Sequence, residues 1–228
     1  MRLDYLPDDQ FTLKELVGPR QRGVHYSDLI KLLQRERQPA KFFNSDAEEW
    51  EDKDLLRLEV GHTFEELLSG ALMRRHAGLV RPEPITCDGV ICSPDGWIPE
   101  RRRLEEWKAG WMSLNREDTL LDFRWWWFYQ IPCYVHVIQQ AYGVTVEDAV
   151  LRVFYVNGNY SRKDFDICGK CGQPANGPHV HAYRVRWYPD EPAEKWQELL
   201  SIGVEYGLLA VRADGSYGAG PRAGTPPP

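Results

Sequence analysis

The sequence predicts an α/β protein with a mixed central β-sheet that is flanked by helices. Segments with helical periodicity alternate with short segments rich in β-branched and aromatic residues. The order expected along the chain is helix, helix, strand, strand, helix, strand, strand, helix, and this order is typical of a mixed sheet. The 228 residues are enough to bury a sizeable core.

The first half of the chain contains two expected helices and two expected strands. Residues 25–37 form a short helix with leucines on one face, inside a lead-in that spans 1–45, and residues 46–76 form a longer helix. After two prolines, residues 85–92 have strand composition, "SPDGW" is typical of a hairpin turn, and 101–111 is the expected returning strand.

The second half starts with a long helical stretch at 118–143, in which we expect Pro132 to introduce a kink or a break. Two strands follow, and between them residues 157–181 form a hairpin excursion. A final amphipathic helix begins at Asp190 or Glu191. We place the main core at 46–210 and expect a disordered Gly/Pro tail at 211–228.

Composition excludes several classes of protein. The chain has no secretory signal and no apolar run long enough to span a membrane, so we expect it in the cytoplasm of a bacterium or of a phage-infected host. Its net charge of −6 argues against a protein that coats nucleic acid non-specifically, but not against an enzyme with a basic face. The odd number of cysteines, five, favours free or metal-bound thiols over disulfides.

The strand at 101–111 carries the residues with the clearest chemical meaning. Glu106 and Lys108 are two residues apart, so they face the same side of a strand, with Trp107 on the other side. A hairpin can bring Asp88 from the preceding strand next to them. Two carboxylates in such a place suit Mg²⁺ or Mn²⁺, and a lysine beside them can stabilise charge in a transition state. Glu105 should face away from the metal, together with Trp107.

Two further segments fit this site. The helix just upstream carries Glu65, which can supply a third carboxylate, although His62 and Glu66 are alternatives. Downstream, Gln130 and Tyr134 are four residues apart and therefore share one helix face, from which they can orient a phosphate or a bound water.

In this order, "GHTFE", "CDGV", "EWK" and "QIPCY" resemble the motifs of the PD-(D/E)xK nuclease superfamily, in the branch of RecB-like and lambda-exonuclease-like phage recombination nucleases. The resemblance covers roughly residues 55 to 140 and implies a restriction-endonuclease-like core. One departure is that Cys87, and not a proline, precedes Asp88.

The resemblance also implies roles for individual residues. Glu65, Asp88, Glu106 and the backbone carbonyl of Trp107 would bind Mg²⁺ or Mn²⁺, and Lys108 would be the catalytic lysine. Gln130 and Tyr134 would lie at the rim of the site and complete its catalytic residues.

The function that the sequence predicts is metal-dependent hydrolysis of DNA phosphodiesters by an exonuclease in DNA recombination, repair or phage replication. Its partners would be DNA and either a second copy of the chain or a recombination partner protein, and no membrane. The alternative is a non-catalytic DNA-binding or scaffold protein in which the nuclease fold is vestigial.

A second group of residues lies in the hairpin excursion. Cys168 and Cys171 form a C-x-x-C pair, and His179 and His181 follow after a Gly/Pro-rich loop. Two cysteines and two histidines are a known ligand set for structural Zn²⁺. The alternative is a turn with free thiols that is rich in glycine for geometric reasons.

Arginines near the expected site can form a phosphate-binding face that the overall charge hides. For any single arginine, ordinary solvated surface is the simpler interpretation. The candidates for DNA binding are Arg74, Arg75, Arg101, Arg102, Arg103 and Arg124.

Overall fold

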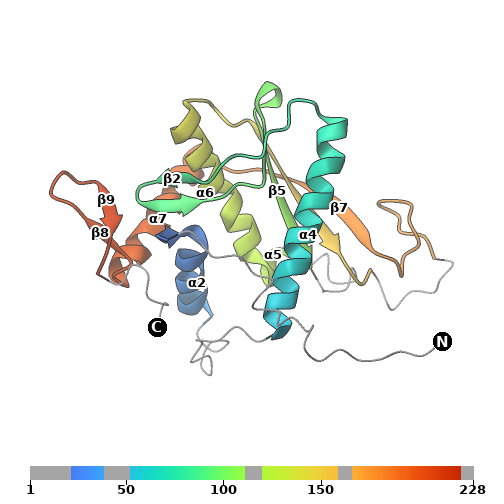
Figure 1. Ribbon diagram of the computed structural model, residues 1–228, viewed down its shortest axis with the longest axis horizontal. Coiled ribbons are helices and arrows are strands. Elements are labelled where there is room, and N and C mark those ends of the chain that lie inside the picture. The colour runs from blue at the N-terminus through green and yellow to red at the C-terminus, as the bar shows by residue number, and fades with distance from the viewer. Residues whose placement is uncertain (1–21, 39–51, 111–119, 159–165, 222–228) are drawn as a thin grey trace, which may run out of the picture.

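The computed structural model describes residues 22–38, 52–110, 120–158 and 166–221 (Figure 1). In these residues the chain is a mixed α/β protein whose sheets are flanked by helices, which confirms the expected fold class. The helices are α2 (Tyr26–Arg37), α4 (Asp52–Arg75), α5 (Leu120–Phe123), α6 (Trp125–Tyr142) and α7 (Glu191–Glu205), with a 3-10 turn, η2, at Pro99–Arg101. The strands are β1 (Val24–His25), β2 (Ile85–Cys87), β3 (Val90–Cys92), β4 (Gly96–Ile98), β5 (Arg103–Gly110), β6 (Asp148–Tyr155), β7 (His179–Val185), β8 (Leu209–Val211) and β9 (Tyr217–Ala219).

The main sheet has the strand order β4-β5-β6-β7. Strand β5 pairs antiparallel with β4 and parallel with β6, and β6 pairs antiparallel with β7, so the sheet is mixed. Strand β6 is rich in valine, leucine and aromatic side chains, whereas β5 carries four charged residues. Both strands are nevertheless mostly buried, as the two central strands of a sheet should be.

Helices cover both faces of the main sheet. On one face, Phe64 and Leu72 of α4 pack against Trp107 of β5. On the other face, Leu104 of β5 belongs to the large core that includes Ile131 of α6 and also side chains of α2 and α7. The alternation of side chains along β5 therefore directs odd-numbered residues to α4 and even-numbered residues to α6.

A smaller sheet with the order β1-β3-β2 shows that one expected strand pairing is wrong. We expected the strand that carries Asp88 to pair with the strand that carries Glu106. Instead β2 folds back on β3, because Asp88 (φ 48°) and Gly89 (φ 75°) make a two-residue turn between them. Aspartate and glycine both tolerate positive φ angles, so an Asp-Gly pair is a strong signal for a hairpin turn. Here that turn lies between β2 and β3.

The expected turn at "SPDGW" is also wrong. Residues Gly96–Ile98 are strand β4, and the chain reverses later, through η2 and Arg102, which has a left-handed backbone (φ 45°). The correct partner of β5 is therefore the strand that begins directly after Asp95.

Two other expectations differ from the structure. The helix does not break at Pro132, which lies inside α6, and the interruption of the helical stretch lies at Arg124, between α5 and α6. The tail that was expected to be disordered forms the β8–β9 hairpin in its described part, with Asp214 accepting hydrogen bonds from Ser216 at the turn. In Figure 1 this hairpin lies at the opposite end of the molecule from the excursion that follows β6.

The remaining expected elements agree with the structure where it describes them. The helix at 25–37, the two strands of the second half and the final helix all form. The segment 46–51 of the expected long helix lies outside the described residues, as do parts of the lead-in, the excursion and the tail. No helix among the described residues is long and apolar enough to cross a membrane.

Candidate functional site

Strand β5 separates two neighbouring glutamates onto opposite faces of the sheet. Lys108 Nζ lies 2.5 Å from Glu106 Oε1, so these two side chains share one face, as their spacing predicts. Glu105 points the other way and accepts two hydrogen bonds from Arg152, at 2.8 and 3.1 Å. Arg152 is the register partner of Trp107 on β6, which places Glu105 on the Trp107 face. The expected orientation of Glu105 and Glu106 is confirmed.

The second carboxylate at Glu106 comes from Asp95, which the sequence interpretation missed. Gly96 pairs with Glu105 in the antiparallel β4–β5 ladder, so the preceding residue, Asp95, falls beside Glu106. The Asp95 carboxylate accepts a hydrogen bond from the backbone N–H of Trp107 at 2.7 Å. A signal for this residue is present in the sequence, because Asp95 follows a proline and Asp88 does not.

The carboxylates of Asp95 and Glu106 are both removed from water, with relative exposures of 8% and 1%. Burial raises the pKa of Glu106 well above its usual range, and the negative charge of Asp95 raises it further, against the opposing effect of Lys108. Burial also raises the pKa of Asp95, although Lys108 and the Trp107 N–H oppose this. The two carboxylates therefore resist being ionised together unless a cation lies between or beside them.

One oxygen of Glu106 strengthens this conclusion. Within the described part of the chain, Glu106 Oε2 is buried and accepts no hydrogen bond from an N–H group, and the Glu106 and Asp95 carboxyl groups lie within hydrogen-bonding reach of each other. A buried acceptor without a partner is costly, and in a native protein it points to a missing ligand such as an ion or water.

Lys108 remains a cation in this setting. Burial lowers its pKa, but the carboxylates of Glu106 and Asp95 raise it by more, and Glu65 adds to their effect. The net result is a lysine pKa above its usual range, so Lys108 is charged near neutral pH.

Helix α4 brings Glu65 to the edge of this cluster. Burial and the charge of Asp95 raise the pKa of Glu65, and Lys108 and Arg81 oppose the rise. Arg81 Nη2 lies 3.1 Å from Glu65 Oε2, so this arginine is a further residue of the site that the sequence interpretation did not place there. The two alternatives to Glu65 are both exposed on α4, namely His62 and Glu66.

Helix α6 covers the same face of β5 and carries Gln130 and Tyr134. Tyr134 is buried, and its pKa is raised first by burial and next by the charge of Glu106, while a hydrogen bond with Gln130 lowers it. Tyr134 therefore lies within electrostatic range of the carboxylates, and Gln130 lies within hydrogen-bonding reach of Tyr134. Their role at the rim of the site stays a prediction. The Trp107 carbonyl stays a predicted ligand.

The structure does not bring Asp88 to Glu106 and Lys108. Its Oδ2 accepts a hydrogen bond from Trp196 Nε1 of α7 at 2.7 Å, and its other close neighbours are Cys87 and His136. Asp88 therefore serves the β2–β3 turn and its contact with α7, and Asp95 occupies the position that we had assigned to it.

The candidate DNA-binding arginines are not gathered at the carboxylates. Arg103 pairs with Asp148, and Arg102 pairs with Glu147 at 2.7 Å. Arg124 lies over the rings of Trp126 and Trp127, at the interruption between α5 and α6. The others are exposed, at the end of α4 and in η2, and they are Arg74, Arg75 and Arg101.

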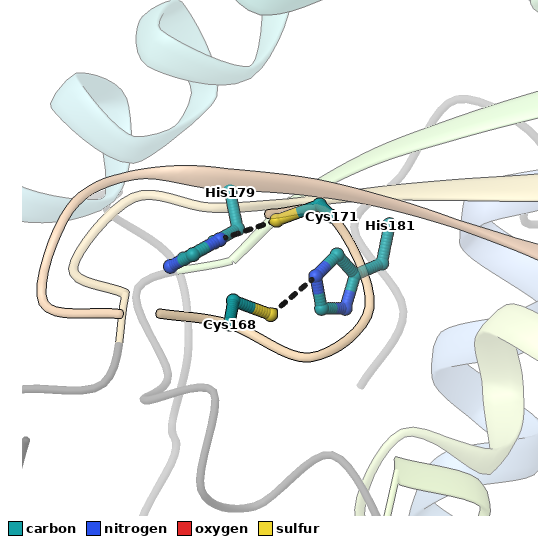
Figure 2. Close-up of side chains that lie close together, drawn as sticks. All are labelled: Cys168, Cys171, His179 and His181. Atoms are coloured by element: carbon teal, nitrogen blue, oxygen red, sulfur yellow. Dashed lines mark hydrogen bonds between the residues drawn. The ribbon is translucent and has the colours of Figure 1, made fainter. Parts of the chain in front are cut away.

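A separate cluster lies at the end of the β6–β7 hairpin, where the ligand atoms of Cys168, Cys171, His179 and His181 are all within 4.8 Å of one another. Cys171 Sγ lies 2.9 Å from His179 Nδ1, and Cys168 Sγ lies 3.6 Å from His181 Nε2 (Figure 2). The structure therefore confirms that these residues converge, and the cluster is a possible metal site.

The second ring nitrogen of His179 supports this interpretation. It lies 3.1 Å from the carbonyl oxygen of Ala175, to which it donates when Nδ1 carries the lone pair. Metal-binding histidines commonly use their second nitrogen in this way, which fixes the tautomer. Burial raises the pKa of the Cys168 thiol, but N–H groups of Lys170 and Cys171 and the contacts with Cys171 and His181 outweigh burial and bring it to about 7.

Comparisons with known proteins give no family for the chain. No protein-family model matches it, and no curated protein matches it. Among solved structures, it is similar to a phage-related exonuclease from Haemophilus somnus 129PT, with a TM-score of 0.47 and 15% identity, covering 82% of this chain and 94% of that one. It is also similar to SSO0001, with a TM-score of 0.46 and 12% identity, covering 85% of this chain and 82% of that one. At these scores and identities, neither similarity assigns an activity to the present chain.

Proposed function

We propose that this protein is a Mg²⁺- or Mn²⁺-dependent deoxyribonuclease that hydrolyses phosphodiester bonds. The observation that carries the proposal is the pair of buried carboxylates, Asp95 and Glu106, beside a charged lysine two residues further along the same strand. This arrangement matches the Asp…Glu-x-Lys order of the nuclease superfamily that the sequence resembles, with Asp95 in place of Asp88.

The residues of the site fit a hard divalent cation. Asp95, Glu106 and Glu65 offer carboxylate oxygens, which Mg²⁺ and Mn²⁺ prefer, and Glu106 Oε2 accepts no hydrogen bond from an N–H group among the described residues. The bound ion would supply Lewis-acid stabilisation of the charge that develops on the phosphodiester.

The protein's own groups supply the rest of the site. Lys108 is charged and held by Glu106, so it can stabilise the additional negative charge of the phosphate in the transition state. Gln130 and Tyr134 share a hydrogen bond on the helix that covers this face of β5, and we assign to them the orientation of the substrate phosphate. Arg81, held by Glu65, adds a second positive charge at the edge of the site.

The finer parts of the proposal come from the sequence resemblance. They are the exonuclease mode of cleavage, the place in DNA recombination, repair or phage replication, and the association with a second copy or a recombination partner protein. The expected location in a bacterial or phage-infected cytoplasm belongs with them.

The proposal assigns a different metal to the Cys/His cluster. Two thiolates and two imidazoles are soft to borderline donors, and they select Zn²⁺ over the hard cations of the carboxylate site. The Nδ1 of His179 and the Nε2 of His181 face the two sulfurs, so all four donors can point at one ion.

The direct test is DNA cleavage. Linear and covalently closed circular duplexes are incubated with the protein in the presence of Mg²⁺ or Mn²⁺, and without added divalent cation. We expect degradation of the linear duplex only when the cation is present, and a loss of at least about 100-fold in rate for Lys108→Ala, on the scale of other single charge-stabilising groups. If the protein binds DNA and leaves both substrates intact, it is a non-catalytic DNA-binding protein and the proposal is wrong.

A further inference from the structure

We propose that the zinc held by Cys168, Cys171, His179 and His181 clamps the N-terminal end of helix α6 onto the sheet beside the nuclease site, so that loss of zinc impairs DNA cleavage. The inference rests on the proposed function, because it gives the Cys/His cluster a role in that reaction. The cluster would bind no substrate and act through α6.

The cluster and the carboxylate site lie on the same face of the main sheet. Lys108 is the register partner of Val153, and Val153 is the register partner of His181. Residues paired in this way point to the same face of a sheet. Two strand spacings separate Lys108 from His181, which is roughly 10 Å between their Cα atoms.

Helix α6 spans both sites with a single face. Trp127 and Tyr134 are seven residues apart, which places them on the same side of the helix, two turns from each other. At one end, Tyr134 lies within electrostatic range of Glu106. Trp127 packs at the other end in a buried cluster with Val153, Tyr155 and Cys168.

Packing contacts connect the Cys/His cluster to α6, so that loss of the metal would change the position of this helix. Cys168 is part of the core beneath Trp127, and Cys171 packs against the same core. His179 and His181 are 1% and 5% exposed, and buried imidazoles are stable only with partners. Without an ion, the polar side chains beneath α6 lose their common partner, and the position of Trp127 is no longer fixed from below.

The local backbone forms a tight turn at the tip of the excursion. Cys168 N–H donates to the Gln173 carbonyl at 2.8 Å, and Gly172 N–H donates to the Cys168 carbonyl at 2.9 Å, which closes a tight turn around the C-x-x-C pair. Gly172 has a φ of 72°, which favours glycine at this place. The two sulfurs are thereby held close enough together to bind one ion.

The first experiment measures bound zinc by elemental analysis of the purified full-length chain. We expect about one zinc per chain in the wild type and in Glu106→Gln, and none in the double variant Cys168→Ser/Cys171→Ser. Cys87→Ser is the matched control, since Cys87 is a free thiol outside the cluster, and it should retain zinc. Replacing the zinc with Co²⁺ should give the thiolate-to-cobalt charge-transfer absorption of a site with two sulfur ligands.

The second experiment measures cleavage of a linear duplex at saturating Mg²⁺ together with the melting temperature. The double variant should cleave at least about tenfold more slowly than Cys87→Ser, because it loses interactions that hold residues of the site in position. If the double variant does not fold, Cys171→His replaces it, because it keeps four ligands and should retain zinc, melting temperature and cleavage.

The outcomes separate this inference from the proposed function. A wild-type chain without zinc overturns the inference, and so does a zinc-free variant that melts and cleaves like Cys87→Ser. A Cys171→His variant that lacks zinc, yet melts and cleaves like the wild type, also overturns it. A zinc-containing wild type that cleaves no DNA overturns the proposed function, while the zinc measurement itself still stands.

Discussion

The assignment of Asp95 as the aspartate of the site, in place of Asp88, predicts opposite results for the same substitution at the two positions. Asp95→Asn should remove most metal-dependent cleavage, because the substitution takes away one of two buried carboxylates that face a common point. Asp88→Asn should leave cleavage within about twofold of wild type, because Asp88 contacts Trp196 on another part of the fold.

The magnitudes follow from the contacts. The loss of a metal ligand should reduce cleavage by at least about 100-fold, since even groups that only support a ligand reduce activity by about 10- to 100-fold. That corresponds to at least about 2.7 kcal/mol of transition-state stabilisation. At Asp88 the amide oxygen of asparagine can still accept the Trp196 hydrogen bond, so the free energy of unfolding should change by about 1 kcal/mol or less.

The assay is the initial rate of degradation of an end-labelled linear duplex in Mg²⁺ and in Mn²⁺, with circular dichroism as the check that both variants are folded. Asp95→Asn retains an oxygen that can accept the Trp107 N–H, so a folding defect is not expected. The reasoning is refuted if Asp88→Asn abolishes cleavage while Asp95→Asn cleaves like wild type.

The other predictions concern the two glutamates of β5 and the helix above them. In buffer without divalent cations, the melting temperature should fall as the pH rises above the usual glutamate pKa of about 4.3, because folded Glu106 holds its proton more tightly than unfolded Glu106. Thermal denaturation over a series of pH values measures this fall, and Glu106→Gln should make it smaller. Glu105→Ala should lower the free energy of unfolding by about 3 kcal/mol in urea denaturation, because it leaves Arg152 without its buried partner, and the folded fraction should cleave at the wild-type rate. Tyr134→Phe should lower kcat by about tenfold or less with the metal affinity unchanged, and a complete loss of metal binding would contradict its position at the rim.

The sequence predicted the parts of the site that depend on local geometry. Glu106 and Lys108 share a face because a strand repeats every two residues, and this holds whichever strands lie beside it. Gln130 and Tyr134 share a helix face for the corresponding reason. The convergence of the two cysteines and the two histidines in the excursion was also predictable, because the four side chains lie on one hairpin.

The sequence did not predict the aspartate, because its position depends on which strands pair. Both "CDGV" and "SPDGW" contain Asp-Gly, and either can form a turn. The structure uses Asp88–Gly89 as the turn and Asp95–Gly96 as the entry to a strand. The choice is decided by the pairing of β4 with β5, whose paired residues lie five to nine positions apart in the chain. The composition of the two Asp-Gly segments does not show which of them begins that hairpin.

The expected DNA-binding face shows the same limit. Arg102 and Arg103 are close in sequence to Glu106, yet both are engaged with acidic residues around the start of β6. Arg81, which no motif singled out, lies at the carboxylate cluster because its side chain meets Glu65 across the site. Proximity in sequence is therefore a poor guide to the charges that gather at the carboxylate cluster.

The most direct test of the central claim is a crystal structure of the protein soaked in Mn²⁺, with the metal located from its anomalous scattering. We expect a peak bound by the carboxylates of Asp95 and Glu106, with Lys108 close by. A peak at Asp88, Cys87 and His136 with none at Asp95 and Glu106, or no peak at either place, would contradict it.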